Sequence, residues 1–204
     1  MARISLLLIA SICFGALLAS GSASWFVRPG LVGLVAMLIG AWLVRRYWQG
    51  LRIDGRPGSP ERALWHGLAA FGVLLGHLLA TIWQLGLPFE MHSLAGHALA
   101  VDNWTLVLGA IASYWMARDP EPRRDERDEL IRTSGLQAGH RTLLSLLVAI
   151  ILVFGFAGDT VVGRFNQPML AHMLIMTVLA QCLAQVVVQL RLYCRDAADE
   201  RNRQ

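Results

Sequence analysis

The chain has 204 residues, of which 55% are hydrophobic and only 16% are charged, and its mean hydropathy is +0.50. An average soluble domain carries about 25% charged residues, so this composition excludes a disordered or collagen-like chain and disfavours an ordinary soluble enzyme. All 18 basic residues are arginines, the net charge is +4, and the arginines flank apolar segments. This placement indicates contact with a membrane surface, and no nucleic-acid partner is expected.

Six apolar segments follow one another along the chain, each close to the roughly 20 residues that a helix needs to cross a bilayer. We expect spans at residues 4–26, 30–48, 63–86, 95–117, 141–158 and 168–193. The segments lack the period-two alternation of barrel strands, and a spanning segment must satisfy its own backbone hydrogen bonds. The sequence therefore predicts an all-α polytopic membrane protein, a single integral domain (1–204) whose six transmembrane helices form three hairpins.

The first segment has a second interpretation as a secretory signal. Small residues at Gly21, Ser22 and Ala23 resemble a cleavage site, and cleavage there would leave five spans. The apolar stretch from Ile4 to Ala19 is long for a signal peptide, which favours an uncleaved anchor.

The arginines are distributed unequally between the two sides of the predicted helices. Alternate connecting segments contain 16 and 2 arginines, and the positive-inside rule assigns the richer side to the cytoplasm. Both termini are then cytoplasmic, and we expect a multi-pass protein of a bacterial inner (cytoplasmic) membrane. The absence of a C-x-x-C pair among three cysteines gives no indication of a disulfide framework.

Residues 118–140 are predicted to form a cytoplasmic linker with a short amphipathic helix. An acid-rich run, which is a candidate docking site for a protein partner, consists of Asp125, Glu126, Arg127, Asp128 and Glu129. Asp128 and Arg132 are spaced to pair along a helix, so a self-paired linker is the alternative. This Asp-Glu-Arg-Asp helix leading into a span, over residues 125–158, resembles a linker of uncharacterised families of small prokaryotic polytopic membrane proteins. The resemblance implies no activity.

Two polar stripes follow the third and sixth spans. The stripe on the third span consists of His66, His77, Thr81 and Gln84. The stripe on the sixth consists of Thr177, Gln181, Gln185 and Gln189. We expect the two stripes to face each other. Hydrogen bonding between helices is the simplest role, and a hydrated proton path is the functional alternative, because a membrane-embedded histidine can titrate near neutral pH.

Asp102 is expected about one and a half turns inside the fourth span, where a neighbouring histidine or Asn103 would stabilise its charge. His97, Asp102 and His172 form a weak alternative as metal ligands, without a compact metal motif such as H-E-x-x-H. A haem site is a weaker alternative still, because it would need a pair of histidines at matched depth and His77 has no such partner in the sequence. No cofactor is expected.

Small residues predict close contacts between helices. They are Ser11, Gly15, Ala19 and Ala23 on the first span and Gly72 and Gly76 on the third. Such residues allow helix backbones to approach closely, either within one chain or between copies in a homo-oligomer.

The sequence contains no Walker loop and no G-x-S-x-G motif, and no nucleophile and base can be paired. The leading interpretation is a non-enzymatic membrane protein that binds a cytoplasmic or membrane protein partner through its arginine-rich cytoplasmic loops. The first alternative is a small transporter or proton-coupled permease that uses the third and sixth spans. The second is a metal- or haem-binding membrane component.

Overall fold

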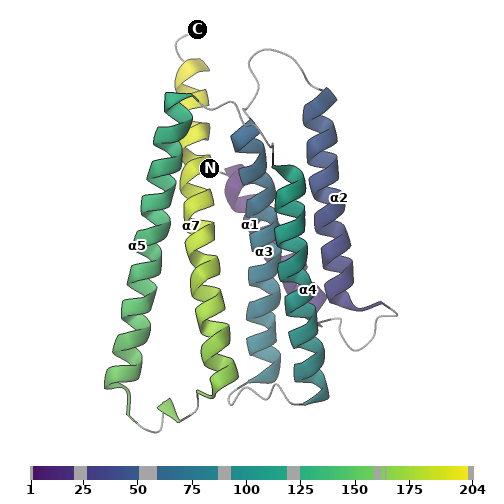
Figure 1. Cartoon of the computed structure of the whole chain (residues 1–204), viewed down its shortest axis with the longest axis vertical. Coiled ribbons are helices and arrows are strands. Elements are labelled where there is room, and N and C mark those ends of the chain that lie inside the picture. The colour runs from purple at the N-terminus through teal and green to yellow at the C-terminus, as the bar shows by residue number, and fades with distance from the viewer. Residues whose placement is uncertain are drawn as a thin grey trace.

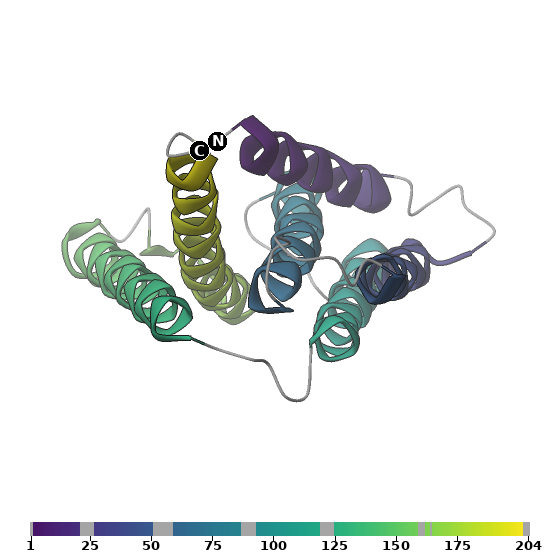
Figure 2. The same cartoon turned by 90° about the horizontal axis from the view of Figure 1, so that it is seen from above.

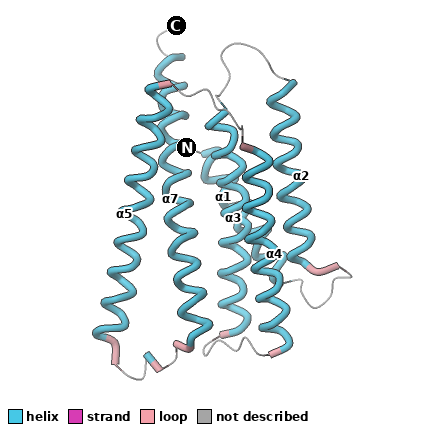
Figure 3. The backbone as a smooth tube through the Cα atoms, viewed as in Figure 1, coloured by secondary structure: helices cyan, strands magenta, loops and turns pink. Residues whose placement is uncertain are grey.

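The computed structural model describes residues 2–20, 27–50, 59–86, 93–118, 125–158, 162–163 and 165–201. The long helices are α1 (Ala2–Ser20), α2 (Pro29–Gly50), α3 (Ser59–Leu85), α4 (Leu94–Ala117), α5 (Glu126–Phe156) and α7 (Gln167–Arg201) (Figures 1 and 3). The described residues include no strand. All six helices are long and apolar enough to cross a membrane, which confirms the all-α polytopic fold.

The helix boundaries differ from the expected ones mainly at α5. The predicted linker helix and the fifth span are one continuous helix of 31 residues. Asp125 caps it: the side chain accepts a hydrogen bond from the backbone of Asp128, whose own carboxylate accepts one from the backbone of Asp125. This reciprocal cap satisfies N–H groups that the first turn leaves unpaired, so the helix begins in the polar segment and continues into the apolar one. The candidate cleavage site at residues 21–23 lies outside the described residues.

The helices form three consecutive hairpins, but the closest packing does not follow chain order throughout. Helix α1 packs mainly on α3, α2 mainly on α4, and α5 on α7, while α3 also contacts α4 and α7. The view from above shows α1 lying across α3 and α5 at the outer edge beyond α7 (Figure 2). Helix α3 is therefore the centre of the bundle, and its side chains Leu68 and Leu78 are almost completely buried.

The contact between α1 and α3 is made by the predicted small residues. A Cβ atom added to Gly15 would overlap the carbonyl oxygen of Val73, and one added to Gly76 would overlap the carbonyl oxygen of Ile12. A Cβ at Gly72 would lie 2.7 Å from the Cβ of Ser11. The small residues of the first and third spans thus meet within one chain, and neither glycine at the crossing can be enlarged without separating the two backbones.

Candidate functional site

A buried polar cluster is centred on His77, which is fully inaccessible on α3. Its Nδ1 atom lies 2.7 Å from Oδ1 of Asn103 on α4. Because an amide oxygen can only accept, Nδ1 carries the hydrogen and donates it. Neutral His77 therefore presents an unprotonated Nε2. This atom is buried and has no hydrogen-bond partner within the part of the chain that the structure describes.

Two further ionisable groups lie within electrostatic reach of His77, namely Asp102 on α4 and His172 on α7. His172 is buried, and its Nε2 atom lies 3.2 Å from the carbonyl oxygen of Leu78. A carbonyl can only accept, so Nε2 of His172 is the donor. His77 of α3 is therefore the histidine within electrostatic reach of Asp102, and Asn103, which follows Asp102 in sequence, is the hydrogen-bond partner of His77.

Helix α2 completes the surroundings of Asp102, which is buried at 3% exposure. A Cβ atom on Gly30 would lie 2.7 Å from both Oδ1 and Cα of Asp102. Gly30 is in the first turn of α2, directly after Pro29, where the positive end of the helix dipole favours a neighbouring negative charge. The sequence analysis missed Gly30, although the Pro-Gly pair at a helix start was a readable signal.

The predicted stripe on α3 is only partly buried. His66, His77 and Thr81 are buried, whereas Gln84 is exposed near the end of the helix. Thr81 donates to the backbone carbonyl of His77 at 2.8 Å, so it is satisfied within its own helix. His66 lies near Gly40 of α2, and its Nε2 is also buried without a hydrogen-bond partner among the described residues. The two histidines are 11 residues apart on one face of α3, a rise of about 16 Å.

The glutamine stripe of α7 does not face α3, so the expectation that the two stripes face each other is wrong. Cβ atoms added to Gly135 and Gly139 of α5 would contact Gln189 in the first case and Gln181 and Gln185 in the second. The two glycines remove side chains from α5 and leave space for the long amides of α7. The missed signal was the G-x-x-x-G spacing of Gly135 and Gly139.

The residues of the metal alternative are not brought together. His97 is exposed on α4, while Asp102 and His172 are buried. His97 and Asp102 are five positions apart, which places them on well-separated sides of the helix. Among the described residues, no three His, Cys, Asp or Glu side chains are grouped closely enough to hold a metal ion.

The acid-rich run is largely occupied by contacts within the chain. Besides its role in the cap, Asp128 accepts a hydrogen bond from the Tyr193 hydroxyl at 2.6 Å. Arg127 pairs with Asp196 of α7 at 3.0 Å. The expected pairing of Asp128 with Arg132 is replaced by Glu129 with Arg132 at 2.8 Å, because Asp128 points to the cap and to α7.

These contacts give the run a structural role in joining the ends of α5 and α7. Tyr193 is only 8% exposed for the same reason. Glu126 stays exposed on the outer side of α5.

Comparison with known protein families, with curated proteins and with solved structures gives no match to this chain.

Proposed function

We propose that this integral membrane protein is a small proton-coupled permease in which His77 accepts and releases the proton. The observation that carries the proposal is the unpartnered, buried Nε2 of His77, whose tautomer is fixed by Asn103. A buried polar atom without a partner is rare in stable structures and marks a site that can take up a ligand, in this case a proton.

The surroundings suit reversible protonation. Uptake of a proton at Nε2 converts His77 to an imidazolium that still donates Nδ1–H to Asn103, and release restores the lone pair. Asp102 lies within electrostatic reach and favours a positive charge on His77, whereas His172, which is also within reach, opposes that charge when it is itself protonated. His66, about 16 Å along the same face of α3, is a second group of the same kind and supports a path toward the other side of the membrane.

The test is proton flux into liposomes that contain the purified protein and an internal pH-sensitive dye. Wild type is expected to dissipate an imposed pH gradient, and H77Q is expected to abolish the flux, because an amide cannot bind a proton near neutral pH. H97Q removes an exposed histidine from α4 and is the matched control that keeps its flux. Thermal unfolding in detergent should show H77Q to be folded, with a loss of no more than about 1–2 kcal/mol. A wild type without flux, or a folded H77Q with full flux, would refute the proposal.

The orientation of the permease rests on the arginine distribution and is tested separately. Reporter fusions after Gly55 and Glu121 are expected to be cytoplasmic, and a fusion after Phe89 external, since alternate connections contain 16 and 2 arginines. An external signal from either arginine-rich connection would reverse or overturn the assignment of the cytoplasmic side.

As a second candidate function we propose binding of a cytoplasmic protein at the outward side of the first turns of α5. Glu126 and Leu130 are exposed there, and Leu130 is 71% exposed. An acidic and apolar pair of this kind suits a basic amphipathic segment of the partner. E126R reverses the charge without removing the cap, and it is expected to abolish co-purification of such a partner, whereas R141Q on the same helix leaves it unchanged. Equal recovery with wild type and E126R would exclude this surface.

A further inference from the structure

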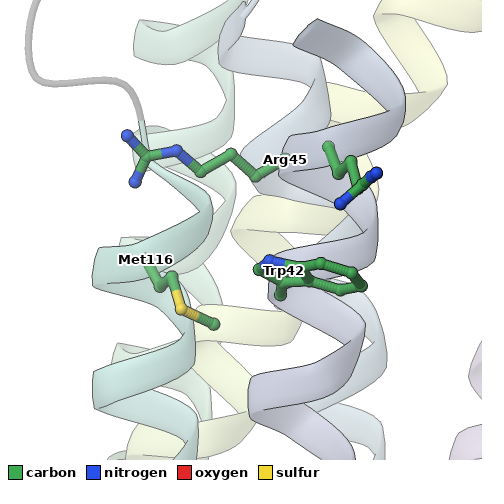
Figure 4. Close-up of a pocket in the computed structure, with 4 residues that line it drawn as sticks. Trp42, Arg45 and Met116 are labelled. Carbon is green, nitrogen blue, oxygen red and sulfur yellow. The ribbon is translucent and has the colours of Figure 1, made fainter. Parts of the chain in front are cut away.

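A cavity of about 390 Å³ lies between α2 and α4 near the end of each helix, lined by Trp42, Arg45, Arg46 and Met116 (Figure 4). Both helices end on the arginine-rich side of the molecule, which the positive-inside rule assigns to the cytoplasm. Arginine-flanked helix ends of this kind are expected at the depth where lipid headgroups meet the hydrocarbon region.

The two arginines of this cavity are arranged differently. The Arg46 guanidinium lies over the Trp42 ring, 5.3 Å from its centroid, which is cation–π distance. The Arg45 side chain extends from α2 toward α4, on the side where Met116 lies (Figure 4). Both arginines are exposed, and neither forms an ion pair with a carboxylate among the described residues. The cavity thus combines two positive charges with an apolar wall made of an indole and a thioether.

We propose that this cavity binds an anionic phospholipid of the cytoplasmic leaflet. The headgroup phosphate lies beside the Arg45 guanidinium, Arg46 supplies a second positive charge, and the upper part of an acyl chain lies against Trp42 and Met116. Basic pockets between transmembrane helices on the cytoplasmic side are suited to anionic headgroups. Trp42 is 49% exposed on α2, where the surrounding medium is lipid, so the wall favours a membrane lipid over a free phosphate ion.

The experiment is native mass spectrometry of the full-length purified protein, titrated with phosphatidylglycerol or with phosphatidylcholine of the same chain length. Wild type is expected to retain one phosphatidylglycerol in preference to phosphatidylcholine. Each of R45Q and R46Q should weaken binding about fivefold, and the double variant about thirtyfold, the contribution expected of basic residues near a membrane surface. The double variant R45K/R46K keeps both charges and should retain most of the affinity.

R141Q is the matched control, because it removes an exposed arginine from α5, away from the cavity. It is expected to bind phosphatidylglycerol like wild type. The proposal is overturned if R45Q/R46Q binds phosphatidylglycerol as tightly as wild type, or if R141Q loses as much affinity, which would mean diffuse charge attraction. It is also overturned if inorganic phosphate displaces the lipid at equal concentration, which would indicate a site for a free anion.

Discussion

The helix pair α1–α3 and the helix pair α5–α7 solve the same packing problem in different ways. At the first crossing the backbones approach so closely that Gly15 and Gly76 have no room for a methyl group. At the second, glycines of α5 accommodate the amide side chains of α7, and polar side chains join the helix ends. Burial differs accordingly: in the most apolar 18-residue stretch of each helix, 50% of the residues are buried in α3 but only 6% in α5.

The two contacts can differ in this way because the helices are surrounded by lipid and not by water. Lipid is as apolar as a leucine side chain, so burying apolar surface between helices gains little in a membrane, and close packing and hydrogen bonds take over. The α1–α3 contact relies on close packing at the centre of the bundle, next to the buried His77. The α5–α7 contact relies on polar groups, and the rest of α5 presents apolar side chains such as Ile151 and Phe156, 66% and 86% exposed, to the surrounding lipid. A rigid centre and a more loosely attached hairpin are the expected consequence.

The largest effect is expected at the centre. G76A places a methyl group on the carbonyl of Ile12, and because a backbone cannot rotate away, α1 and α3 must move apart. We expect a loss of about 2–3 kcal/mol, the usual cost of overpacking, measured as a lower midpoint of thermal unfolding in detergent.

The matched control for this variant is G155A on α5, where an added Cβ meets nothing within 4 Å. This variant is expected to be neutral or to gain up to about 1 kcal/mol, since alanine favours the helix. Equal midpoints for G76A and G155A would show that the α1–α3 crossing does not limit stability.

A smaller effect is expected where α5 and α7 are joined by side chains. Y193F removes the hydroxyl that donates to Asp128 at 2.6 Å and leaves the packing of the ring in place. A hydrogen bond to a charged group contributes about 1.5–3 kcal/mol, and solvent near Asp128 places the expected loss at the lower end.

A double-mutant cycle with D128A, which removes the acceptor, isolates this interaction. Because D128A also weakens the cap of α5, its single effect is larger than that of Y193F, and only the coupling energy reports the hydrogen bond between the helices. A coupling energy of zero would mean that the α5–α7 ends are held by other contacts, such as Arg127 with Asp196.

The sequence predicted the helices and the polar positions better than it predicted their neighbours. Run length and apolarity suffice for six spans, and helical periodicity placed His66, His77 and Thr81 on one face of α3, where all three are buried. Periodicity assigns a residue to a face but does not say which helix covers that face, so the glutamines of α7 were assigned to the wrong partner. Gln84 has the spacing of the α3 stripe but lies past the buried part of that helix, so its predicted burial was wrong. Gly30 was missed because its role depends on Asp102, which is 72 positions later in the chain.

The smallest effect is expected for G135A on α5, and this variant tests directly whether the two contacts differ in kind. The added methyl group would overlap the side chain of Gln189, which is a flexible chain that can adopt another rotamer. The gain in helix propensity of up to about 1 kcal/mol offsets the cost of moving the amide, so the net change in unfolding free energy should stay within about 1 kcal/mol. Truncating the neighbour in G135A/Q189A should relieve whatever loss remains, whereas no single truncation can rescue G76A, because its obstacle is backbone. Thermal unfolding of the three variants in the same detergent makes the comparison. A loss for G135A as large as that for G76A, without rescue by Q189A, would show that α5 and α7 are packed as rigidly as α1 and α3.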